Sequence, residues 1–279
     1  MKCFLAPAVF FLLILPLLSE EGKKIASLSP NLTEMVFLLG KGDCLVGRSS
    51  FCDAPPEAKK IRVVGSFGKP FPEPLIASGA KIVITSTVRA KAVPEMLEKA
   101  GIRLVVIPDS SFKQYFAALE LLGKLLDCRS RAQLEIQKAK KELEQLRRDT
   151  DRIPREKRPS VLVLISLSPP VTAGKKSFIN EMIQLAGGRN VAEQVNQDYF
   201  TCSPEWIYLN QPDLIILCRM DGEKAAENLK QISLFSRLKA VRNNRVLQDL
   251  DPSLLYRLGP RTFLGIRWMN HFFFPENPH

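Results

Sequence analysis

Short runs of apolar, mostly β-branched residues alternate with helical stretches in the first part of the chain. The runs predict strands at Lys24–Ser29, Asp43–Gly47, Ile61–Val64, Lys81–Thr87 and Ile102–Pro108, with helices at Thr33–Leu39 and Pro94–Ala100. Glycines at positions 40 and 101 end the two helices. Because the last two strands are almost continuously apolar, we expect them to be buried in a parallel sheet covered by helices on both faces.

The pattern changes after residue 110. From Phe112 to about Arg148 apolar residues recur at helical spacing, with one Gly and no Pro. This stretch predicts one long helix, a stiff spacer that limits closure of the parts it joins. A second alternation follows, with strands expected at Val161–Ser166, Asp213–Cys218 and Arg245–Leu250 and helices at Lys176–Ala186, Glu223–Gln231 and Arg261–Phe273.

These patterns predict an α/β fold of two similar lobes with mainly parallel sheets, joined by one long rigid helix. The expected boundaries are 20–110 for the N-terminal lobe, 111–150 for the connecting helix and 151–279 for the C-terminal lobe. An internal repeat supports the duplication. Ser-Leu-Ser-Pro occurs at Ser27–Pro30 and at Ser166–Pro169, and in each half seven residues separate a Glu, Glu73 or Glu205, from an apolar strand. Two facing lobes make a cleft, so we expect a small-molecule binding protein.

The N-terminus has the layout of a secretory signal. Lys2 precedes the apolar run Phe4–Leu18, and the small residue Ser19 follows it, so residues 1–19 are interpreted as a signal peptide of an exported, periplasmic protein. An uncleaved anchor or a buried helix is the alternative, but the run is shorter than the ~20 residues that span a bilayer. Of the cysteines after this segment, Cys44 and Cys52 are close enough in sequence to bridge a loop, but spacing alone does not decide their geometry.

The chain carries a formal net charge of +11, with many basic residues between Lys138 and Arg158. A basic run can bind nucleic acid or an anionic membrane, or it can be the solvated face of a helix. Acids at Glu142, Glu144 and Asp149 and the lack of interleaved aromatic residues favour the solvated face. We therefore expect no nucleic-acid partner.

Signatures of enzymes are mostly missing. The two histidines, His271 and His279, lie at the C-terminus, so no histidine-based triad or histidine-rich metal site is expected in the cleft. Gly174–Ser177 resembles the end of a phosphate-binding loop, but Pro169 stands where that loop needs its first Gly. We expect no catalytic residues, no metal site and no enzyme. A hydrolase or a sensor module on the same fold is the alternative from another class.

Two further patterns point to binding. Glu73 and Glu205 each follow a Pro at the start of a short helix, where the helix dipole favours a carboxylate. Their matching positions predict a docking pair for a two-fold partner, with simple dipole stabilisation as the alternative. Aromatic residues lie in loops rich in Pro and Gly, where some are expected to line a pocket for a large, flat, partly apolar ligand. They are Phe51, Phe67, Phe71, Tyr199, Phe200 and Tyr256.

Ordered segments along the chain resemble one known family. They are 25–34 (IASLSPNLTE), 46–56 (VGRSSFCDAPP), 74–84 (PLIASGAKIVI), 168–174 (SPPVTAG), 187–190 (GGRN), 203–207 (SPEWI), 211–216 (QPDLII) and 259–261 (GPR). The set is similar to the helical-backbone class of periplasmic substrate-binding proteins of ABC importers, and within it to the members that bind cobalamin. The likeness covers essentially the whole chain after the signal segment.

The resemblance implies a monomer that holds its ligand between two lobes that move little. It places the acids that dock on the permease dimer at Glu73 and Glu205. It places a ligand-contacting aromatic at Phe51, where cobalamin-binding members carry a Tyr, and another near Phe67, where they carry a Trp. The ligand-binding set that we expect is Pro30, Phe51, Phe67, Ser168, Pro169, Pro170, Tyr199, Tyr256 and Arg257.

The implied ligand is a corrinoid, cobalamin or its precursor cobinamide, carried as cargo and not as a prosthetic group. Relatives carry a ferric siderophore or haem in the same cleft, and this is the alternative ligand. Arg48, Arg89, Arg257 and Tyr256 are then the residues expected to face an anionic chelate.

Overall fold

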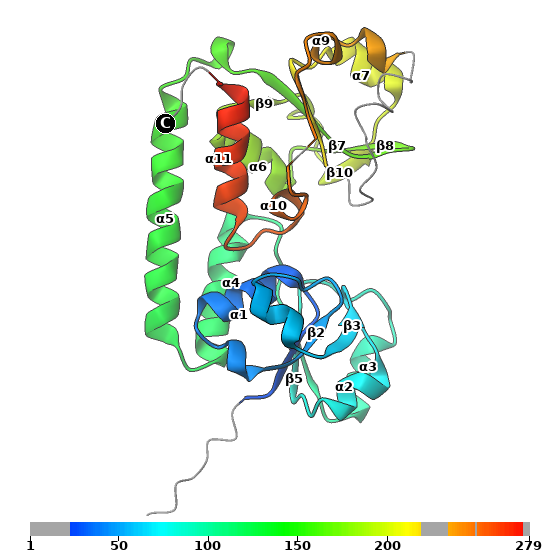
Figure 1. Cartoon of the computed structure of the whole chain (residues 1–279), viewed down its shortest axis with the longest axis vertical. Helices are drawn as coiled ribbons and strands as arrows, with labels where there is room; N and C mark the ends of the chain where they lie inside the picture. The colour runs from blue at the N-terminus through cyan, green and yellow to red at the C-terminus, as the bar shows by residue number, and fades with distance from the viewer. Residues whose placement is uncertain (1–22, 219–233, 249, 276–279) are drawn as a thin grey trace, which may run out of the picture.

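The computed structural model describes residues 23–218, 234–248 and 250–275. It shows two α/β lobes placed side by side with a column of helices along one flank (Figure 1). The predicted signal segment 1–19 and the predicted helix Glu223–Gln231 lie outside the described residues. None of the helices in the described part is long and apolar enough to cross a membrane.

The N-terminal lobe is built on a six-stranded sheet with the order β4-β3-β2-β1-β5-β6, parallel except for β4. Its strands are β1 (Ile25–Ser27), β2 (Leu45–Ser49), β3 (Val63–Ser66), β4 (Lys69–Pro70), β5 (Ile82–Thr85) and β6 (Arg103–Val106). Its helices are α1 (Pro30–Leu38), α2 (Pro72–Ala77) and α3 (Val93–Lys99), with 3₁₀ turns η1 (Gly42–Cys44) and η2 (Pro56–Lys60).

Burial within this sheet follows strand position. Ile25 in β1 and Val83 in β5 have no exposed surface, because both strands have a neighbour on each side and helices over the sheet. The expectation that the strand after residue 101 is buried is wrong. β6 lies at the edge of the sheet, and Val106 at its end is 48% exposed.

The second sheet has the order β10-β8-β7-β11-β12, and β9 also pairs with β7. Its strands are β7 (Ser160–Leu167), β8 (Pro170–Ala173), β9 (Arg189–Asn190), β10 (Tyr199–Thr201), β11 (Leu214–Leu217) and β12 (Val246–Leu247). The other elements of this lobe are η3 (Arg155–Lys157), α6 (Phe178–Leu185), α7 (Pro204–Asn210), η4 (Phe235–Arg237), α9 (Lys239–Arg242), α10 (Ser253–Tyr256) and α11 (Thr262–Phe273).

The antiparallel strands β8 and β10 are not among the predicted elements. β8 follows β7 after the two residues Ser168 and Pro169, and β10 pairs with β8 in turn. Both strands are short and lack a long apolar run, so their pairing depends on the neighbouring strand. The predicted fold class is nevertheless confirmed, with two mixed α/β lobes and mainly parallel strand pairs.

The connector consists of two helices and not of one. α4 (Phe112–Leu125) ends in a three-residue turn, and α5 (Arg129–Asp151) runs back along it past both lobes (Figure 1). Asp127 in the turn has a left-handed φ of 51°, a conformation that Asp tolerates better than most residues. Gly123 lets the helices approach closely, since a Cβ at this position would lie 2.4 Å from the Cβ of Ala132. The continuous helical periodicity gave no signal for this turn.

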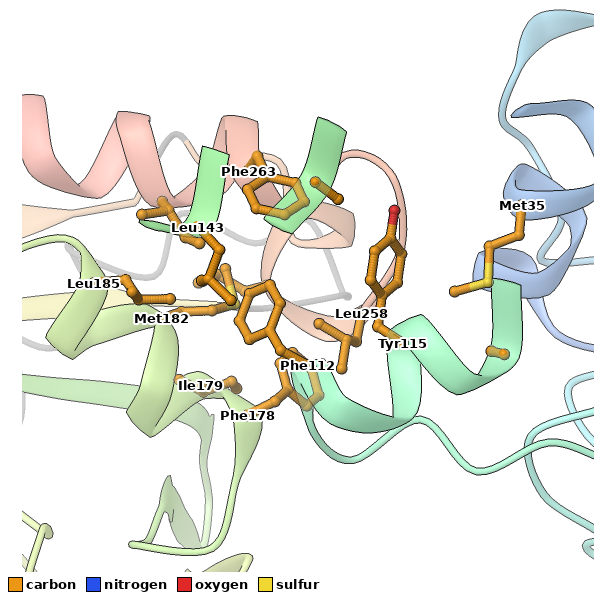
Figure 2. Packing of buried hydrophobic residues seen from close by; sticks show 14 of the residues in the cluster. Met35, Phe112, Tyr115, Leu143, Phe178, Ile179, Met182, Leu185, Leu258 and Phe263 are labelled. Atoms are coloured by element: carbon orange, nitrogen blue, oxygen red, sulfur yellow. The ribbon is translucent and has the colours of Figure 1, made fainter. Parts of the chain in front are cut away.

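One hydrophobic cluster continues from the first lobe into the second. It includes Met35 from α1, Phe112 and Tyr115 from α4, Met182 from α6 and Phe263 from α11 (Figure 2). The ring centroids of Phe112 and Phe263 are 5.7 Å apart. A shared core of this kind opposes a wide hinge motion and supports the expectation that the lobes move little.

Candidate functional site

Small polar side chains gather at the carboxyl ends of the central strands of the N-terminal lobe. Ser29 follows β1, and its hydroxyl lies 3.1 Å from the hydroxyl of Ser86, which follows β5. The backbone N–H of Ser86 donates to the Ser29 hydroxyl at 2.8 Å. In open parallel sheets this edge is where ligands bind.

Asn31 joins Asp109, which follows β6, to the second lobe. The Asn31 amide donates to an Asp109 carboxylate oxygen at 2.9 Å and to the backbone carbonyl of Leu258 at 3.3 Å. Burial raises the pKa of Asp109 above its ordinary value, although hydrogen bonds from Ser86 and Asn31 lower it in part. The carboxylate therefore lies at the junction between the lobes.

The two predicted aromatic residues of the N-terminal lobe are fixed by their neighbours. Phe51 is 44% exposed, while Cys52 beside it is fully buried and accepts a hydrogen bond from Thr33 at 3.1 Å. Phe67 lies in the turn between β3 and β4, and the guanidinium carbon of Arg89 is 5.0 Å from its ring centroid. The buried cysteine and the cation over the ring restrict how far either loop can move.

The Phe67 turn requires a glycine. Gly68 has a left-handed φ of 64°, and a Cβ there would lie 2.8 Å from the carbonyl oxygen of Thr87. The Gly68 carbonyl also accepts a hydrogen bond from the backbone N–H of Arg89 at 3.0 Å. This close approach places the Arg89 segment against Phe67.

The predicted residues of the C-terminal lobe lie around one end of its sheet. Ser168 and Pro169 form the exposed turn between β7 and β8, and Pro170 begins β8. Tyr199 begins β10 and pairs with Ala173 of β8. These strands lie on the side of the lobe that faces the N-terminal lobe (Figure 1).

Tyr256 is anchored to the strand ends of the same lobe. Its hydroxyl donates to the backbone carbonyl of Cys218, just after β11, and lies 3.5 Å from the carbonyl oxygen of Ile165 in β7. This hydroxyl therefore braces the parallel strands. An anionic chelate would have to compete with these two carbonyls for it.

Tyr199 is partly exposed at the start of β10. Water reaches 41% of its surface, yet desolvation by the surrounding protein is the main cause that raises its pKa to about 12. The negative charges of Asp198 and Asp109 raise this pKa further. Tyr199 thus offers a partly exposed ring at the start of β10, on the side of its lobe that faces the N-terminal lobe (Figure 1).

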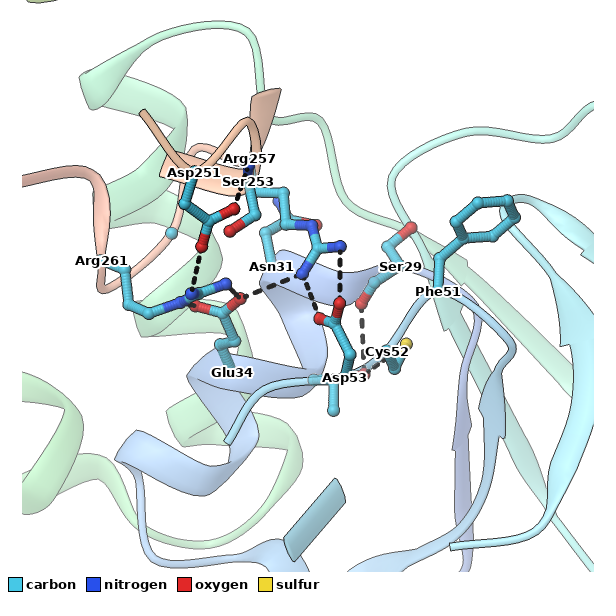
Figure 3. A network of polar contacts seen from close by, with 12 residues as sticks. Ser29, Asn31, Glu34, Phe51, Cys52, Asp53, Asp251, Ser253, Arg257 and Arg261 are labelled. Carbon is cyan, nitrogen blue, oxygen red and sulfur yellow. Dashed lines mark hydrogen bonds and ion pairs between the residues drawn. The ribbon is translucent and has the colours of Figure 1, made fainter. Parts of the chain in front are cut away.

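A network of ion pairs joins the two lobes (Figure 3). Glu34 of α1, whose side chain is 5% exposed, accepts two hydrogen bonds from Arg261 at 2.9 and 3.0 Å. Arg257 pairs with Asp53 and lies 3.8 Å from Glu34. Arg261 also lies 3.5 Å from Asp251. The guanidinium of Arg257, predicted to face the ligand, is directed at acids of the N-terminal lobe.

Of the predicted ligand residues, Arg257 reaches across the junction to Asp53, and Phe51 lies near this pair (Figure 3). Pro30 is buried in the first turn of α1 and offers little surface to a ligand. Its contact with a ligand stays a prediction. Sequence reasoning missed Asn31, Glu34, Asp53 and Asp109 as members of the junction. The one signal in the sequence for this junction was the spacing of Asn31 and Glu34, which lie three residues apart on the same helix face.

The two predicted docking acids occupy equivalent places. Glu73 and Glu205 are exposed in the first turns of α2 and α7. Two residues further on, Leu75 and Ile207 have no exposed surface. Both helices therefore bury the same position and present the same acid.

Two surface depressions lie away from this junction. One of about 570 Å³ is lined by residues of α4 and of the first part of α5, including Glu120, Lys124 and Leu134. The other, of about 410 Å³, lies near the end of α5 and includes Arg147 and Arg158. Neither contains a residue of the predicted ligand set. Among the described residues, no group of three or more His, Cys, Asp or Glu side chains is arranged to hold a metal ion.

Comparisons with known proteins agree with this architecture. The chain is 30% identical over 264 residues to an uncharacterised ABC transporter substrate-binding lipoprotein, YvrC, of Bacillus subtilis, covering 93% of this chain and 82% of the relative. It is 25% identical to a vitamin B12-binding protein of Vibrio vulnificus, covering 90% of each chain.

Solved structures give the same result for the fold. A periplasmic haem-binding protein from Pseudomonas aeruginosa superposes with a TM-score of 0.83 at 25% identity, covering 92% of this chain and 94% of the other. The vitamin B12-binding protein BtuF of Vibrio cholerae gives a TM-score of 0.75 at 22% identity, covering 90% and 96%. The family model for periplasmic binding proteins matches residues 25–252, and the chain belongs to this family.

Proposed function

We propose that this chain is an exported substrate-binding protein that captures a corrinoid between its lobes and delivers it to an ABC importer. Relatives named as vitamin B12-binding and as ABC transporter substrate-binding proteins support the general role. The junction of the lobes supports the site, because it carries exposed aromatic surface at Phe51 and Tyr199 beside small polar groups. Such a mixture suits a large, flat ligand with polar edges.

The observation that carries the choice of ligand is the pairing of the basic residues. Arg257 is committed to Asp53 and Glu34. Arg48 donates to the backbone carbonyls of Ile61, Ser49 and Lys59. Haem carries propionates and many ferric siderophores are anionic, so both gain from cations that are free to pair, and two of the three arginines weighed for this role are engaged elsewhere. A corrin ring is edged with neutral amides and does not need such cations.

Haem is the second candidate ligand. Two haem-binding proteins superpose on this chain with TM-scores of 0.83 and 0.81, above the 0.75 of the vitamin B12-binding protein. Arg89, stacked on Phe67, is the basic residue placed to meet an anionic ligand edge in that case. The identity at these matches is low, so the similarity describes the fold more than the cargo.

The docking part of the proposal rests on Glu73 and Glu205. Both are exposed, and each lies at the start of an equivalent helix in its lobe. A two-fold permease dimer offers the same surface twice, so it matches a protein with one acid per lobe. Complementary charges of this kind act mainly on encounter and orientation.

The test is a titration of the purified protein with cyanocobalamin, cobinamide, haemin and a ferric hydroxamate. Ligand absorbance and tryptophan fluorescence report binding. We expect saturable one-to-one binding of at least one corrinoid at micromolar concentration or below. Binding of haemin or of the ferric chelate without either corrinoid would overturn the ligand assignment and leave the transport role in place.

A further inference from the structure

Asp53 covers the one predicted ligand cation of the C-terminal lobe, Arg257. Arg257 directly follows α10, and Asp53 lies in the loop after β2 of the N-terminal lobe. Nη1 of Arg257 donates to Oδ1 of Asp53, and Nη2 lies 3.4 Å from Oδ2, so the carboxylate takes both ends of the guanidinium. The Arg257 side chain is 14% exposed and the Asp53 side chain is 52% exposed. The acid is therefore the outer member of the pair.

The loop that carries Asp53 is fixed on the sheet. Cys52, the residue before it, is fully buried, and its sulfur accepts a hydrogen bond from Thr33 at 3.1 Å. The backbone N–H of Phe51 donates to the hydroxyl of Ser49, the last residue of β2, at 3.2 Å. Asp53 thus stays over the guanidinium unless a buried contact opens.

No other acid of the network is placed to take over from Asp53. Glu34 is engaged by two hydrogen bonds from Arg261, and its Oε1 lies 3.8 Å from Nη1 of Arg257, beyond hydrogen-bond distance. Asp251 lies 3.5 Å from Arg261. The two arginines face three acids, so the network carries an excess of negative charge. Without Asp53 the donors of Arg257 would be open to an anion from solution.

The pair lies at the edge of the sheet where we propose that the ligand binds. Phe51, which is 44% exposed, lies near the pair (Figure 3). The loop after β2 and Ser29 after β1 follow the carboxyl ends of neighbouring parallel strands, the edge at which open parallel sheets bind ligands. The edge group of a ligand stacked on Phe51 would meet the exposed Asp53 carboxylate before the covered guanidinium.

We propose that Asp53 determines ligand specificity by covering Arg257, so that the junction admits a ligand edged with neutral amides and disfavours one edged with carboxylates. The inference rests on the proposed corrinoid function and names the residue that selects for such a ligand. A carboxylate edge meets a like charge and finds the guanidinium already paired. An amide N–H can donate to the exposed carboxylate. Selection of this kind uses a repulsive element together with an attractive one.

The experiment uses two corrinoids that share one ring and differ in their edge groups. Dicyanocobinamide carries neutral amides and dicyanocobyrinic acid carries carboxylates, and haemin is a second anionic probe. Calorimetry with the folded full chain gives each Kd. We expect Asp53→Ala to bind the two anionic probes about tenfold more tightly than the wild type, the effect of one charge-assisted hydrogen bond, without a gain for dicyanocobinamide. Asp53→Asn, which keeps the shape and removes the charge, should shift the ratio in the same direction.

Two further variants make the assignment specific. Glu57→Ala removes the same charge from an exposed acid of η2 and should leave the ratio of the Kd values unchanged. Arg257→Gln added to Asp53→Ala should abolish the gain, because the uncovered cation is its cause. An unchanged ratio in both Asp53 variants, an equal gain in Glu57→Ala, or a gain that survives Arg257→Gln would each overturn the inference.

Failure of the proposed function gives a different result. Wild-type protein that binds haemin and neither corrinoid would overturn the corrinoid assignment. Haemin then decides the inference by itself, since a tighter Kd for haemin in Asp53→Ala would support the covering role of Asp53. An unchanged Kd for haemin in that variant would overturn the covering role as well.

Discussion

Arg261 donates two hydrogen bonds to Glu34, from Nε to Oε2 at 3.0 Å and from Nη2 to Oε1 at 2.9 Å. The two residues are 227 positions apart, one just before the last helix and one in the first. The pair joins the two lobes. The same carboxylate also lies near Arg257, so one buried acid organises two cations of the opposite lobe.

Replacing Glu34 with Ala should destabilise the protein, because Arg261 and Arg257 lose a buried partner. We expect the free energy of unfolding to fall by roughly 2–3 kcal/mol, since a broken buried pair leaves an uncompensated charge. Chemical denaturation measures the change. Glu57→Ala, at an exposed acid of η2, is the control and should alter stability by less than about 0.5 kcal/mol. A loss for Glu34→Ala no larger than the control's would show that the pair contributes nothing.

Asp53 should make stability depend on pH below its ordinary pKa of 3.8. Burial raises this pKa, but the hydrogen bond and the charge of Arg257 outweigh it and lower the folded-state value. The stabilisation is thus present above about pH 4 and is lost as the pH falls through the folded-state pKa. Because Asp53 is half exposed, the effect should stay below ~1 kcal/mol.

Denaturation of Asp53→Asn at several pH values tests this. The variant should lose less stability than the wild type between pH 5 and about pH 2.5. Asp109→Asn is the matched contrast. Burial raises the pKa of Asp109, so its ionisation disfavours the folded state, and removing it should raise stability at pH 7 relative to pH 3. Parallel curves for wild type and Asp53→Asn would contradict the assigned pairing.

Gly123→Ala should force α4 and α5 apart. The new Cβ would lie 2.4 Å from the Cβ of Ala132, which no side-chain rotation can relieve. Overpacking costs about 1–3 kcal/mol, more than the roughly 1 kcal/mol that Ala gains over Gly in a helix. In an Ala132→Gly background the same change should be neutral or stabilising. Equal losses in both backgrounds, measured by thermal and chemical unfolding, would exclude this contact as the cause.

Phe51→Ala and Phe67→Ala should weaken ligand binding without unfolding the protein. Loss of a stacking aromatic is expected to cost about 1–3 kcal/mol, or roughly 5- to 150-fold in Kd. Calorimetry with the ligand identified by titration measures the change. Phe71→Ala is the control, because Phe71 is similarly exposed but lies just before α2. Unchanged affinity in both variants would remove these residues from the binding site.

Glu73→Lys combined with Glu205→Lys should impair transport and leave ligand affinity nearly unchanged. The two changes place like charges against the basic surfaces that we propose on the permease, which slows encounter and misorients the complex. Uptake and complex formation with the permease are the measurements. Glu98→Lys with Glu156→Lys alters net charge equally at exposed positions, one in each lobe, and should have little effect. Full uptake by the first double variant, or loss of its ligand binding, would reject the docking role.

The residue pattern predicted the features that depend on short stretches of chain. The β-branched apolar runs became β1, β5, β7 and β11, and the repeated Glu became the first-turn acid of α2 and of α7. Burial of Leu75 and Ile207 at equivalent positions agrees with the duplication. These features follow from side-chain periodicity and local helix signals, which residues near each other in sequence fix by themselves.

Tertiary structure decided what joins the two halves. Arg257 pairs with Asp53 across 204 positions, and α4 turns back at Asp127. None of these contacts changes the local pattern of apolar and polar residues. They arise because the lobes bury one continuous core between them, and that packing selects which distant charges and helices meet.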